Sequence, residues 1–299
     1  MFTIFGATGN TGSVVANALL ARGEKVRVVV RSREKGAALA AKGAEIALGD
    51  VLDGASVAAA LEGAEGAYLL MPPDPTSKDF VGRGRAIVDH YLAALAKHPV
   101  RHAAVLSSVG AQVPAGTGPI VITHYAEQAF AKLAESAAAV KDTRFTFVRA
   151  AYFMENLLGY AHPMKADGLL PVFGGGEGHA FPMVATADIG RTAAEALLAR
   201  PAASSIVELS GPREYSFADG AAEATKLLGR EVVARALPIE GLVPTLTGLG
   251  MSENVAGLFR EMTEGLGKGL VRFEGPSEGR RRALRGTVTL GEVLGAMRG

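Results

Sequence analysis

The residues best suited to chemistry lie near the start of the chain, where glycines are spaced for holding a phosphate group. The stretch Gly6-Ala7-Thr8-Gly9-Asn10-Thr11-Gly12 follows an apolar run at 1–5 and precedes a helix-like stretch at 13–22. Glycine tolerates a positive φ and lets a phosphate approach the backbone without a Cβ in the way, while free N–H groups at a helix N-terminus attract the anion. We therefore predict a strand, a tight turn and a helix that bind the diphosphate of a dinucleotide. The predicted contacts are Gly6, Thr8, Gly9, Asn10, Thr11 and Gly12.

Two arginines follow the next apolar run, at 25–30, where a dinucleotide-binding protein selects its cofactor. An acidic residue near this point binds the ribose hydroxyls of NAD, whereas the 2′-phosphate of NADP requires a cation. The planar guanidinium groups of Arg31 and Arg33 match phosphate oxygens. The sequence therefore favours NADP(H) over NAD(H), and a solvated charge cluster at the strand end is the alternative.

Other candidate cofactor contacts end later apolar runs. Asp50 is expected to accept a hydrogen bond from the adenine amino group, or alternatively to cap a helix. Met71 and Pro72 are expected to lie over the nicotinamide ribose, unless the prolines only terminate the strand. Ser107 and Ser108 end the fifth apolar run and are further expected contacts.

Alternating strands and helices would bring these strand ends together. Apolar runs of strand length alternate with helix-like periodicity over the first 150 residues, with helices expected at 80–97 and at about 124–138. Six such strands predict an α/β fold, with a doubly wound parallel sheet and right-handed crossovers as in the Rossmann fold. In such a sheet the carboxyl ends of the strands form one edge, and ligands bind there.

The pattern changes after residue 150, where the alternation of strands and helices becomes less regular. We predict an NAD(P)-binding Rossmann domain at 1–150 and a smaller C-terminal α+β substrate lobe at 151–183 and 211–299. The stretch 184–210 is expected to return to the sheet as a helix and a strand.

Proline and glycine punctuate two parts of the predicted lobe, and we expect irregular structure at 161–178 and 238–250. Capping boxes at Ser216 and Thr289 predict helices at 219–228 and at the C-terminus.

Composition excludes several classes of function. The 299 residues are 48% hydrophobic and 20% charged with a net charge of +1, so no overall field favours nucleic acid or a membrane surface. The absence of cysteine excludes disulfides and thiolate catalysis, and the six histidines show no metal-site spacing, so no metal is expected. Neither a signal peptide nor a membrane-spanning run is evident, and we expect a cytoplasmic protein.

Two motifs in the last third of the chain are discounted. The stretch 265–269 imitates a phosphate-binding loop, but Met262 replaces its first glycine and Gly269 replaces its Ser or Thr. The basic run at 280–282, with Arg285, is typical of a solvated surface when net charge is small.

The ordered set of motifs resembles the NmrA-like group of atypical short-chain dehydrogenases, which includes NADPH-dependent quinone oxidoreductases. The resemblance covers essentially the whole chain and implies an NAD(P)-binding Rossmann domain with its active site beside a small C-terminal lobe. Its motifs are the glycine-rich stretch at 6–12, Arg31, Gly49-Asp50, Ser107-Ser108, His124, Arg149, Tyr152-Phe153-Met154-Glu155-Asn156, Asp188-Ile189-Gly190 and Leu209-Ser210-Gly211-Pro212.

The chain departs from typical short-chain dehydrogenases at their proton donor, which is a Tyr-x-x-x-Lys pair. Tyr125 is followed four residues later by Ala129, and Lys132 lies two helical turns beyond Tyr125. The usual acid is therefore missing, and we assign Tyr125 to the substrate instead.

His124 occupies the position where the NmrA-like group carries a histidine or a lysine. We predict that it is catalytic, either binding the nicotinamide ribose or relaying a proton near neutral pH. A helix-capping or buried structural histidine is an equal alternative. The glutamate expected four residues later is replaced by Gln128, with Glu127 beside it, and that role is not assigned.

Aromatic residues after the sixth strand could form a slot for a flat ring. Tyr152 is a predicted catalytic residue, and Phe153, Asn156 and Phe173 are predicted substrate contacts. The alternative is ordinary core packing, which we favour for Phe173 and for Phe181.

These features together predict an NADPH-dependent oxidoreductase that transfers hydride to a quinone or a similar conjugated aromatic carbonyl, whose ring delocalises charge without a strong protein acid. One alternative is a redox-sensing regulatory protein that binds NADP(H) without turnover and acts through a homodimer or a protein partner. Another is a tailoring enzyme for a polycyclic aromatic metabolite. We expect a small aromatic substrate and no nucleic acid or membrane partner.

Overall fold

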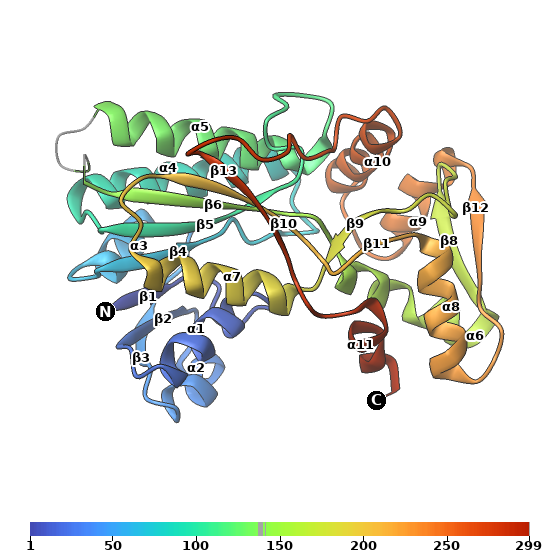
Figure 1. The fold of residues 1–299 in the computed structure, drawn as a ribbon, viewed down its shortest axis with the longest axis horizontal. Coiled ribbons are helices and arrows are strands. Elements are labelled where there is room, and N and C mark those ends of the chain that lie inside the picture. Colours follow the sequence, from blue (N-terminus) through green and yellow to red (C-terminus); the bar gives the residue numbers. More distant parts are fainter. Residues whose placement is uncertain (137–139, 141, 299) are drawn as a thin grey trace.

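Eight parallel strands form the main sheet of the computed structural model, which describes residues 1–136, 140 and 142–298 (Figure 1). Their order across the sheet is β13-β10-β6-β5-β4-β1-β2-β3, so the chain runs outward from β1 in both directions, and the predicted doubly wound fold is confirmed. The strands are β1 Phe2–Ile4, β2 Val26–Val30, β3 Glu45–Leu48, β4 Gly66–Leu69, β5 His102–Ser108, β6 Arg144–Ala150, β10 Ser205–Ser210 and β13 Arg281–Arg285.

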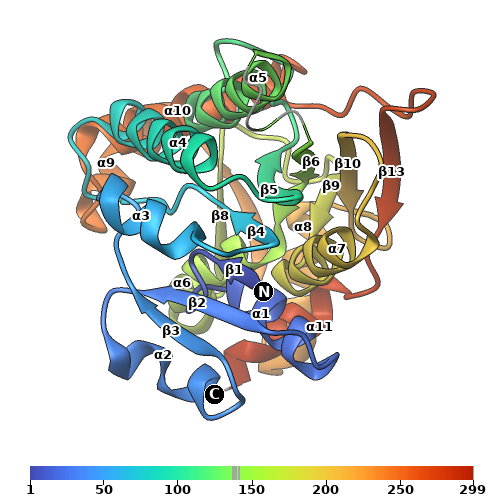
Figure 2. The same cartoon turned by 90° about the vertical axis from the view of Figure 1, so that its left-hand side faces the viewer.

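Helices cover both faces of this sheet, as Figure 2 shows in a view along the strands. One face carries α1 Gly12–Ala21, α2 Arg33–Ala40 and α7 Thr186–Ala199. The other carries α3 Gly54–Leu61, α4 Phe80–Lys97 and α5 Val121–Ser136. Because both faces are buried, successive residues of a strand belong to opposite cores: Ala104 packs with α7, whereas Ala103 and Val105 pack toward α4 and α5.

Residues close in the sequence account for the positions of several of these helices. The predicted helix at 80–97 matches α4, and Asp53 caps α3 by accepting a hydrogen bond from the N–H of Ala55. The 3₁₀ helix η1, Gly118–Ile120, leads directly into α5, which therefore begins before the predicted start at 124. The predicted end of that helix, at Ala138, lies outside the described residues.

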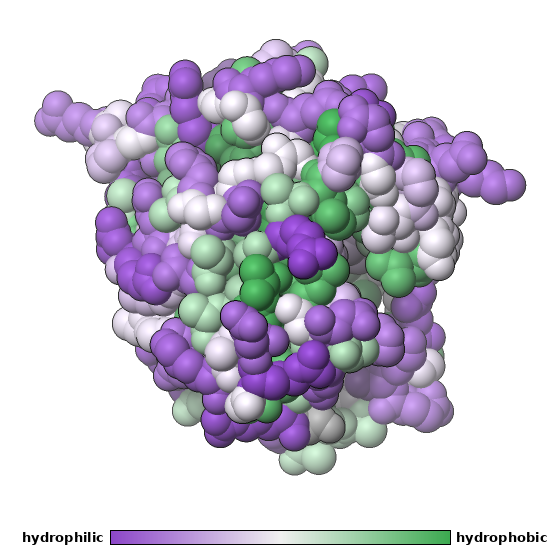
Figure 3. All heavy atoms as spheres, turned by 90° about the vertical axis from the view of Figure 1, so that its right-hand side faces the viewer, coloured by the Kyte–Doolittle hydropathy of each residue, from purple (hydrophilic) through white to green (hydrophobic). Residues whose placement is uncertain are grey.

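The rest of the chain builds a second group of elements beside the strand ends (right in Figure 1). Seen from that side, apolar surface gathers centrally among hydrophilic side chains (Figure 3). Its strands are β7 Tyr152–Phe153, β9 Phe181–Val184 and β11 Glu214–Tyr215 in one small sheet, and β8 Leu169–Phe173 and β12 Val233–Leu237 in another. Its helices are η3 Met154–Tyr160, α6 Ala161–Asp167, α8 Phe217–Leu228, η4 Ile239–Gly241, α9 Leu242–Gly248, α10 Glu253–Gly267, α11 Leu290–Leu294 and η5 Gly295–Arg298.

The expected irregular structure at 161–178 and 238–250 is wrong for much of both stretches. The first contains α6 and β8, and the second contains η4 and α9. Pro163 lies in the first turn of α6 and Pro171 lies in a strand with one neighbour, positions that proline tolerates. The capping boxes at Ser216 and Thr289 are both confirmed.

The chain crosses back to the main sheet twice after residue 150. β10 pairs with β6, and the basic run forms β13, a parallel edge strand on β10. Glu208 of β10 anchors the approach to β13, because its carboxylate accepts the N–H groups of Glu274 and Gly275 at 2.8 and 3.0 Å. The boundaries of the substrate lobe stay a prediction. Across the described part of the chain, no helix is both long and apolar enough to span a bilayer.

Candidate cofactor and active site

The turn between β1 and α1 has the geometry of a phosphate cradle. Gly6 adopts a φ of +62°, and its carbonyl accepts the N–H of Gly9 at 2.9 Å. A Cβ on Gly12 would lie 2.2 Å from the Gly6 oxygen, so only glycine fits where α1 begins. Because the backbone closes on itself here and the N-terminus of α1 faces the turn, these residues fit a dinucleotide diphosphate.

The polar residues of this turn divide into two groups. Thr8 and Asn10 are exposed beside Gly9, where a ligand could contact them. Thr11 is buried, and its Oγ1 accepts the hydroxyl of Tyr68 at 2.9 Å. The structure thus brings Thr8 and Asn10 to the surface of the cradle, while the Thr11 side chain anchors the turn to β4.

Helix α7 packs against the start of α1 on the same face of the main sheet. A Cβ on Gly190 would lie 2.5 Å from Val14 Cβ and 2.8 Å from the Thr11 oxygen, so α7 can approach α1 only with glycine at this point. The neighbouring Asp188 is buried and accepts the N–H of Val288 at 3.0 Å. This motif therefore supports the cradle instead of contacting a ligand.

Arg31 directly follows β2, Arg33 is the first residue of α2, and both side chains are exposed. Arg31 makes no hydrogen bond or ion pair with the described residues, so its guanidinium is available to a 2′-phosphate. Asp50 follows β3, and its Oδ1 accepts the N–H of Leu52 at 2.9 Å. Asp53, and not Asp50, caps the next helix, which leaves the second carboxylate oxygen of Asp50 for a ligand.

The segment after β4 connects the strand ends to α10. Met71 packs against the α4 side of the core, and the Pro72 carbonyl accepts from Arg83 at 2.7 Å. Further along, the N–H of Ser252 donates to the Pro75 carbonyl at 2.9 Å, and Ser252 Oγ donates to the Ser77 carbonyl at 2.5 Å. The segment that follows the predicted nicotinamide contacts Met71 and Pro72 is therefore bonded to the N-terminus of α10.

A buried charged cluster lies at the ends of β5 and β6. Ser107 and Arg149 are opposite each other in the two strands, and both contact Glu127 of α5. Ser107 Oγ donates to Glu127 Oε1 at 2.5 Å. Arg149 donates to the same carboxylate twice, from Nε to Oε1 at 2.9 Å and from Nη2 to Oε2 at 2.6 Å. Arg149 also pairs with Glu274. Ser108 points elsewhere, and its hydroxyl donates to the Val109 carbonyl.

Burial works against the charge of Arg149, but its hydrogen bonds and ion pairs with Glu127 and Glu274 outweigh that effect and raise its pKa. Sequence reasoning gave Glu127 no role. The available signal was a carboxylate one helical turn after His124 together with Arg149, which follows three apolar residues and one threonine near the end of its strand.

His124 lies in the first turns of α5 and is half-buried. Its Nδ1 is 2.8 Å from the carbonyl oxygen of Ala111. Because a carbonyl only accepts, Nδ1 carries a proton and donates it, while Nε2 makes no hydrogen bond with the described residues. The geometry thus agrees with a structural contact at one nitrogen and leaves the other for a ligand.

The structure brings together only part of the predicted aromatic slot. Tyr152 packs edge-on against Phe181 and Phe217, with ring centroids 5.5 and 6.1 Å apart, and burial raises the pKa of its hydroxyl. Phe173 instead packs against α9 in a separate cluster, as the core-packing alternative predicts. Phe153 packs against the core of the main sheet.

Two predicted substrate contacts lie at the surface. Asn156 is exposed in the first turn of η3, where its side chain hydrogen-bonds the hydroxyl of Tyr152. The Tyr125 hydroxyl donates to Asp89 of α4 at 2.6 Å, and Arg85 lies over its ring. The structure therefore directs Tyr125 toward α4 and does not bring it to Tyr152 or His124.

The comparison that decides the family covers this whole arrangement. The model of the NmrA-like family matches residues 1–271, from the cradle through α10. This protein belongs to the NmrA-like family.

Relatives of this NmrA-like protein include an NAD(P)H azoreductase of Xenophilus azovorans, 28% identical over 88% of this chain and 86% of the relative. Quinone oxidoreductase 2 of Escherichia coli is 26% identical over 90% of this chain and 89% of its own. Among solved structures, an NADPH complex of an NADPH-dependent quinone oxidoreductase from Escherichia coli has a TM-score of 0.79 at 22% identity, covering 100% of both chains. A Citrobacter triphenylmethane reductase complexed with NADP(H) has a TM-score of 0.75 at 19% identity, covering 98% of this chain and 95% of its own. The two structures show a shared fold.

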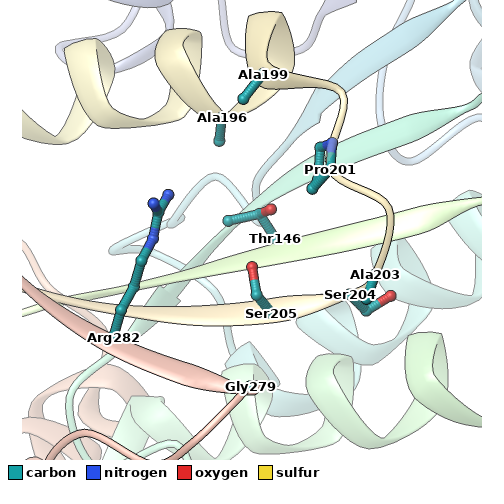
Figure 4. A pocket seen from close by; sticks show the side chains of 9 residues that line it. All are labelled: Thr146, Ala196, Ala199, Pro201, Ala203, Ser204, Ser205, Gly279 and Arg282. Carbon is teal, nitrogen blue, oxygen red and sulfur yellow. The ribbon is translucent and has the colours of Figure 1, made fainter.

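A pocket of about 240 Å³ lies away from these residues, between the end of α7 and the start of β10 (Figure 4). Small side chains of α7 and the following loop form its wall, and Arg282 of β13 reaches across it. It opens at the amino ends of the strands and contains no predicted site residue, so it is not where this NmrA-like protein would bind a dinucleotide. Among the residues described, no group of His, Asp and Glu is arranged to hold a metal ion.

Proposed function

We propose that this protein is an NAD(P)H-dependent oxidoreductase that transfers hydride from NADPH to a quinone or a similar conjugated aromatic carbonyl. The observation that carries the proposal is the cradle at the start of α1. It closes around the Gly6 carbonyl only because position 12 is a glycine. Curated relatives named as an NAD(P)H azoreductase and a quinone oxidoreductase, each covering most of this chain, support the reaction class.

Bound at this edge, the nicotinamide would supply the hydride. The cradle would hold the diphosphate at Gly6, Gly9 and Gly12, with Thr8 and Asn10 at its exposed rim. Arg31, exposed and unpaired among the described residues, would contact the 2′-phosphate, which supports NADPH over NADH.

The side chains near the end of β5 offer little acid to a substrate. The proton of Ser107 is donated to Glu127, and Nδ1 of His124 donates to the carbonyl oxygen of Ala111. Burial raises the pKa of the Tyr152 hydroxyl, so this group is a weaker acid than an exposed tyrosine. A quinone suits such a site because the charge it gains on reduction spreads over its ring, whereas a simple ketone needs a proton donor.

Steady-state oxidation of NADPH with a panel of quinones, an azo dye and an aliphatic ketone tests the proposal. Because a positioned acid contributes roughly a hundredfold or more to carbonyl reduction, we expect quinones to exceed the ketone by at least that factor. Failure of every acceptor despite tight NADPH binding would overturn it. Equal rates with the ketone would remove its chemical basis.

A second candidate is a sensor that binds NADP(H) without turnover, and the attachment of the 71–80 segment to α10 favours it. Hydrogen bonds from Ser252 to Pro75 and Ser77 would pass a movement of the nicotinamide loop to the lobe. A sensor would distinguish NADPH from NADP⁺ strongly and show no turnover with the panel.

A further inference from the structure

The hydrogen bond between Ser107 and Glu127 fixes which role the serine hydroxyl can play. A carboxylate held bidentately by Arg149 is ionised and only accepts, so Ser107 must donate to it. A hydroxyl has one proton and two lone pairs. Ser107 is thereby left as an acceptor, and can receive only a donor from a ligand.

The position of Ser107 narrows what that ligand can be. It is the penultimate residue of β5, and β5 neighbours β4, whose end leads into the Met71-Pro72 segment. The diphosphate cradle at β1 and the arginines after β2 lie on the other side of β4. A dinucleotide that crosses the strand ends from β2 to β5 therefore brings its nicotinamide half toward Ser107.

We propose that Glu127, held by Arg149, is a positioning residue that fixes Ser107 as a hydrogen-bond acceptor for a donor on the nicotinamide half of the cofactor. Two groups there can donate, the carboxamide N–H and a ribose hydroxyl. The proposal rests on the cofactor named in the proposed function but not on the substrate. It assigns Ser107 a role opposite to that of a serine that donates to a substrate carbonyl.

Calorimetric titration of the full chain with NADP⁺ tests this without turnover. Ser107→Ala removes the acceptor and keeps the Glu127–Arg149 pair, and we expect roughly tenfold weaker binding. Glu127→Gln lets the hydroxyl turn its proton toward the ligand, so binding should weaken about threefold to tenfold. In the Ser107→Ala background, Glu127→Gln should add no further loss, because its effect passes through Ser107.

Glu274→Gln is the matched control. It removes another carboxylate from Arg149 while leaving the contact between Ser107 and Glu127 intact, so binding should stay within about twofold of the unmodified protein. If Glu127 only stabilised the fold, Glu274→Gln would weaken binding as much, and Glu127→Gln would weaken the Ser107→Ala protein further. Either result, or unchanged binding by Ser107→Ala, overturns the proposal.

The 3-acetylpyridine analogue of NADP⁺ separates the two donors, because its acetyl group has no N–H. If the carboxamide is the donor, Ser107→Ala binds this analogue as well as the unmodified protein does; if a ribose hydroxyl is the donor, the loss persists. Because this experiment uses only Ser107→Ala and the unmodified protein, it still tests the acceptor role of Ser107 should Glu127→Gln fail to fold. Absence of quinone turnover would overturn the proposed substrate and leave these binding results intact.

Discussion

Ser107 and Glu127 are joined by a hydrogen bond of 2.5 Å between the end of β5 and the second turn of α5. Arg149 completes the contact from β6, so three neighbouring elements meet at one buried carboxylate. The strand ends that face the expected nicotinamide are thereby held by charge as well as by apolar packing.

Replacing Gly12 with alanine should abolish tight cofactor binding, because the new Cβ would lie 2.2 Å from the Gly6 oxygen and open the turn. We expect NADPH affinity to fall at least roughly tenfold, measured by calorimetry. Gly257→Ala in α10 is the control, since nothing lies near its Cβ position and alanine favours a helix. Tight NADPH binding by Gly12→Ala would show that the cradle is not the cofactor site.

Replacing Arg31 with alanine should weaken NADPH binding about tenfold to a hundredfold, because charge-assisted hydrogen bonds to the 2′-phosphate are lost. NADH binding should not change. Arg282→Ala, an exposed arginine at the opposite edge, should leave both affinities unaltered. Equal losses for NADPH and NADH would contradict the assignment of Arg31.

The buried pair of Glu127 and Arg149 should be costly to break. Arg149→Leu leaves the carboxylate of Glu127 buried without its cation, and we expect a loss of about 3–5 kcal/mol in the free energy of unfolding. Arg22→Ala breaks an exposed pair with Glu195 and should cost less than about 1 kcal/mol. Urea unfolding measures both, and similar losses would show that burial does not set the cost.

Stability should fall as the pH drops below neutrality because of His102. Burial lowers the pKa of this histidine to about 4, so between pH 6.5 and 4 the unfolded chain binds a proton that the folded chain does not. Its contribution is present above pH 6.5 and is lost toward pH 4, which amounts to about 2 kcal/mol between pH 7 and 5.

Urea unfolding at the two pH values checks this. In His102→Gln, where glutamine can still bond to Thr146 Oγ1, that part of the pH dependence should disappear. If His102→Gln keeps the full pH dependence of the free energy of unfolding, that dependence comes from other groups.

The parts of the fold that follow from neighbouring residues were predictable. The period of α4 and the capping boxes at Ser216 and Thr289 each depend on side chains within a few positions of the backbone they satisfy. α6, α9 and β13 were not, because they are short and rest on distant partners; β13 pairs with a strand more than 70 residues earlier.

The candidate site divides in the same way. The cradle was predictable, since a positive φ at Gly6 is a local demand that glycine meets. Which side chains meet was not: Tyr125 is directed to Asp89 by the packing of α5 on α4, and Phe173 belongs to a different cluster from Tyr152. The partner of Glu127 could not be identified from the sequence, because the pairing of β6 with β5 is what sets Arg149 opposite Ser107 and within reach of Glu127.

By itself, then, the sequence determined the alternation of strands and helices, the cradle from Gly6 to Gly12 and the cation that follows β2. Only the tertiary structure decided that the Ser107 hydroxyl donates to Glu127, that the segment after β4 is bonded to α10 at Pro75 and Ser77, and that the basic run forms an edge strand of the main sheet. The reason is physical. Backbone conformation is a local property, whereas the direction of a hydrogen bond depends on which charged group the fold places at its other end.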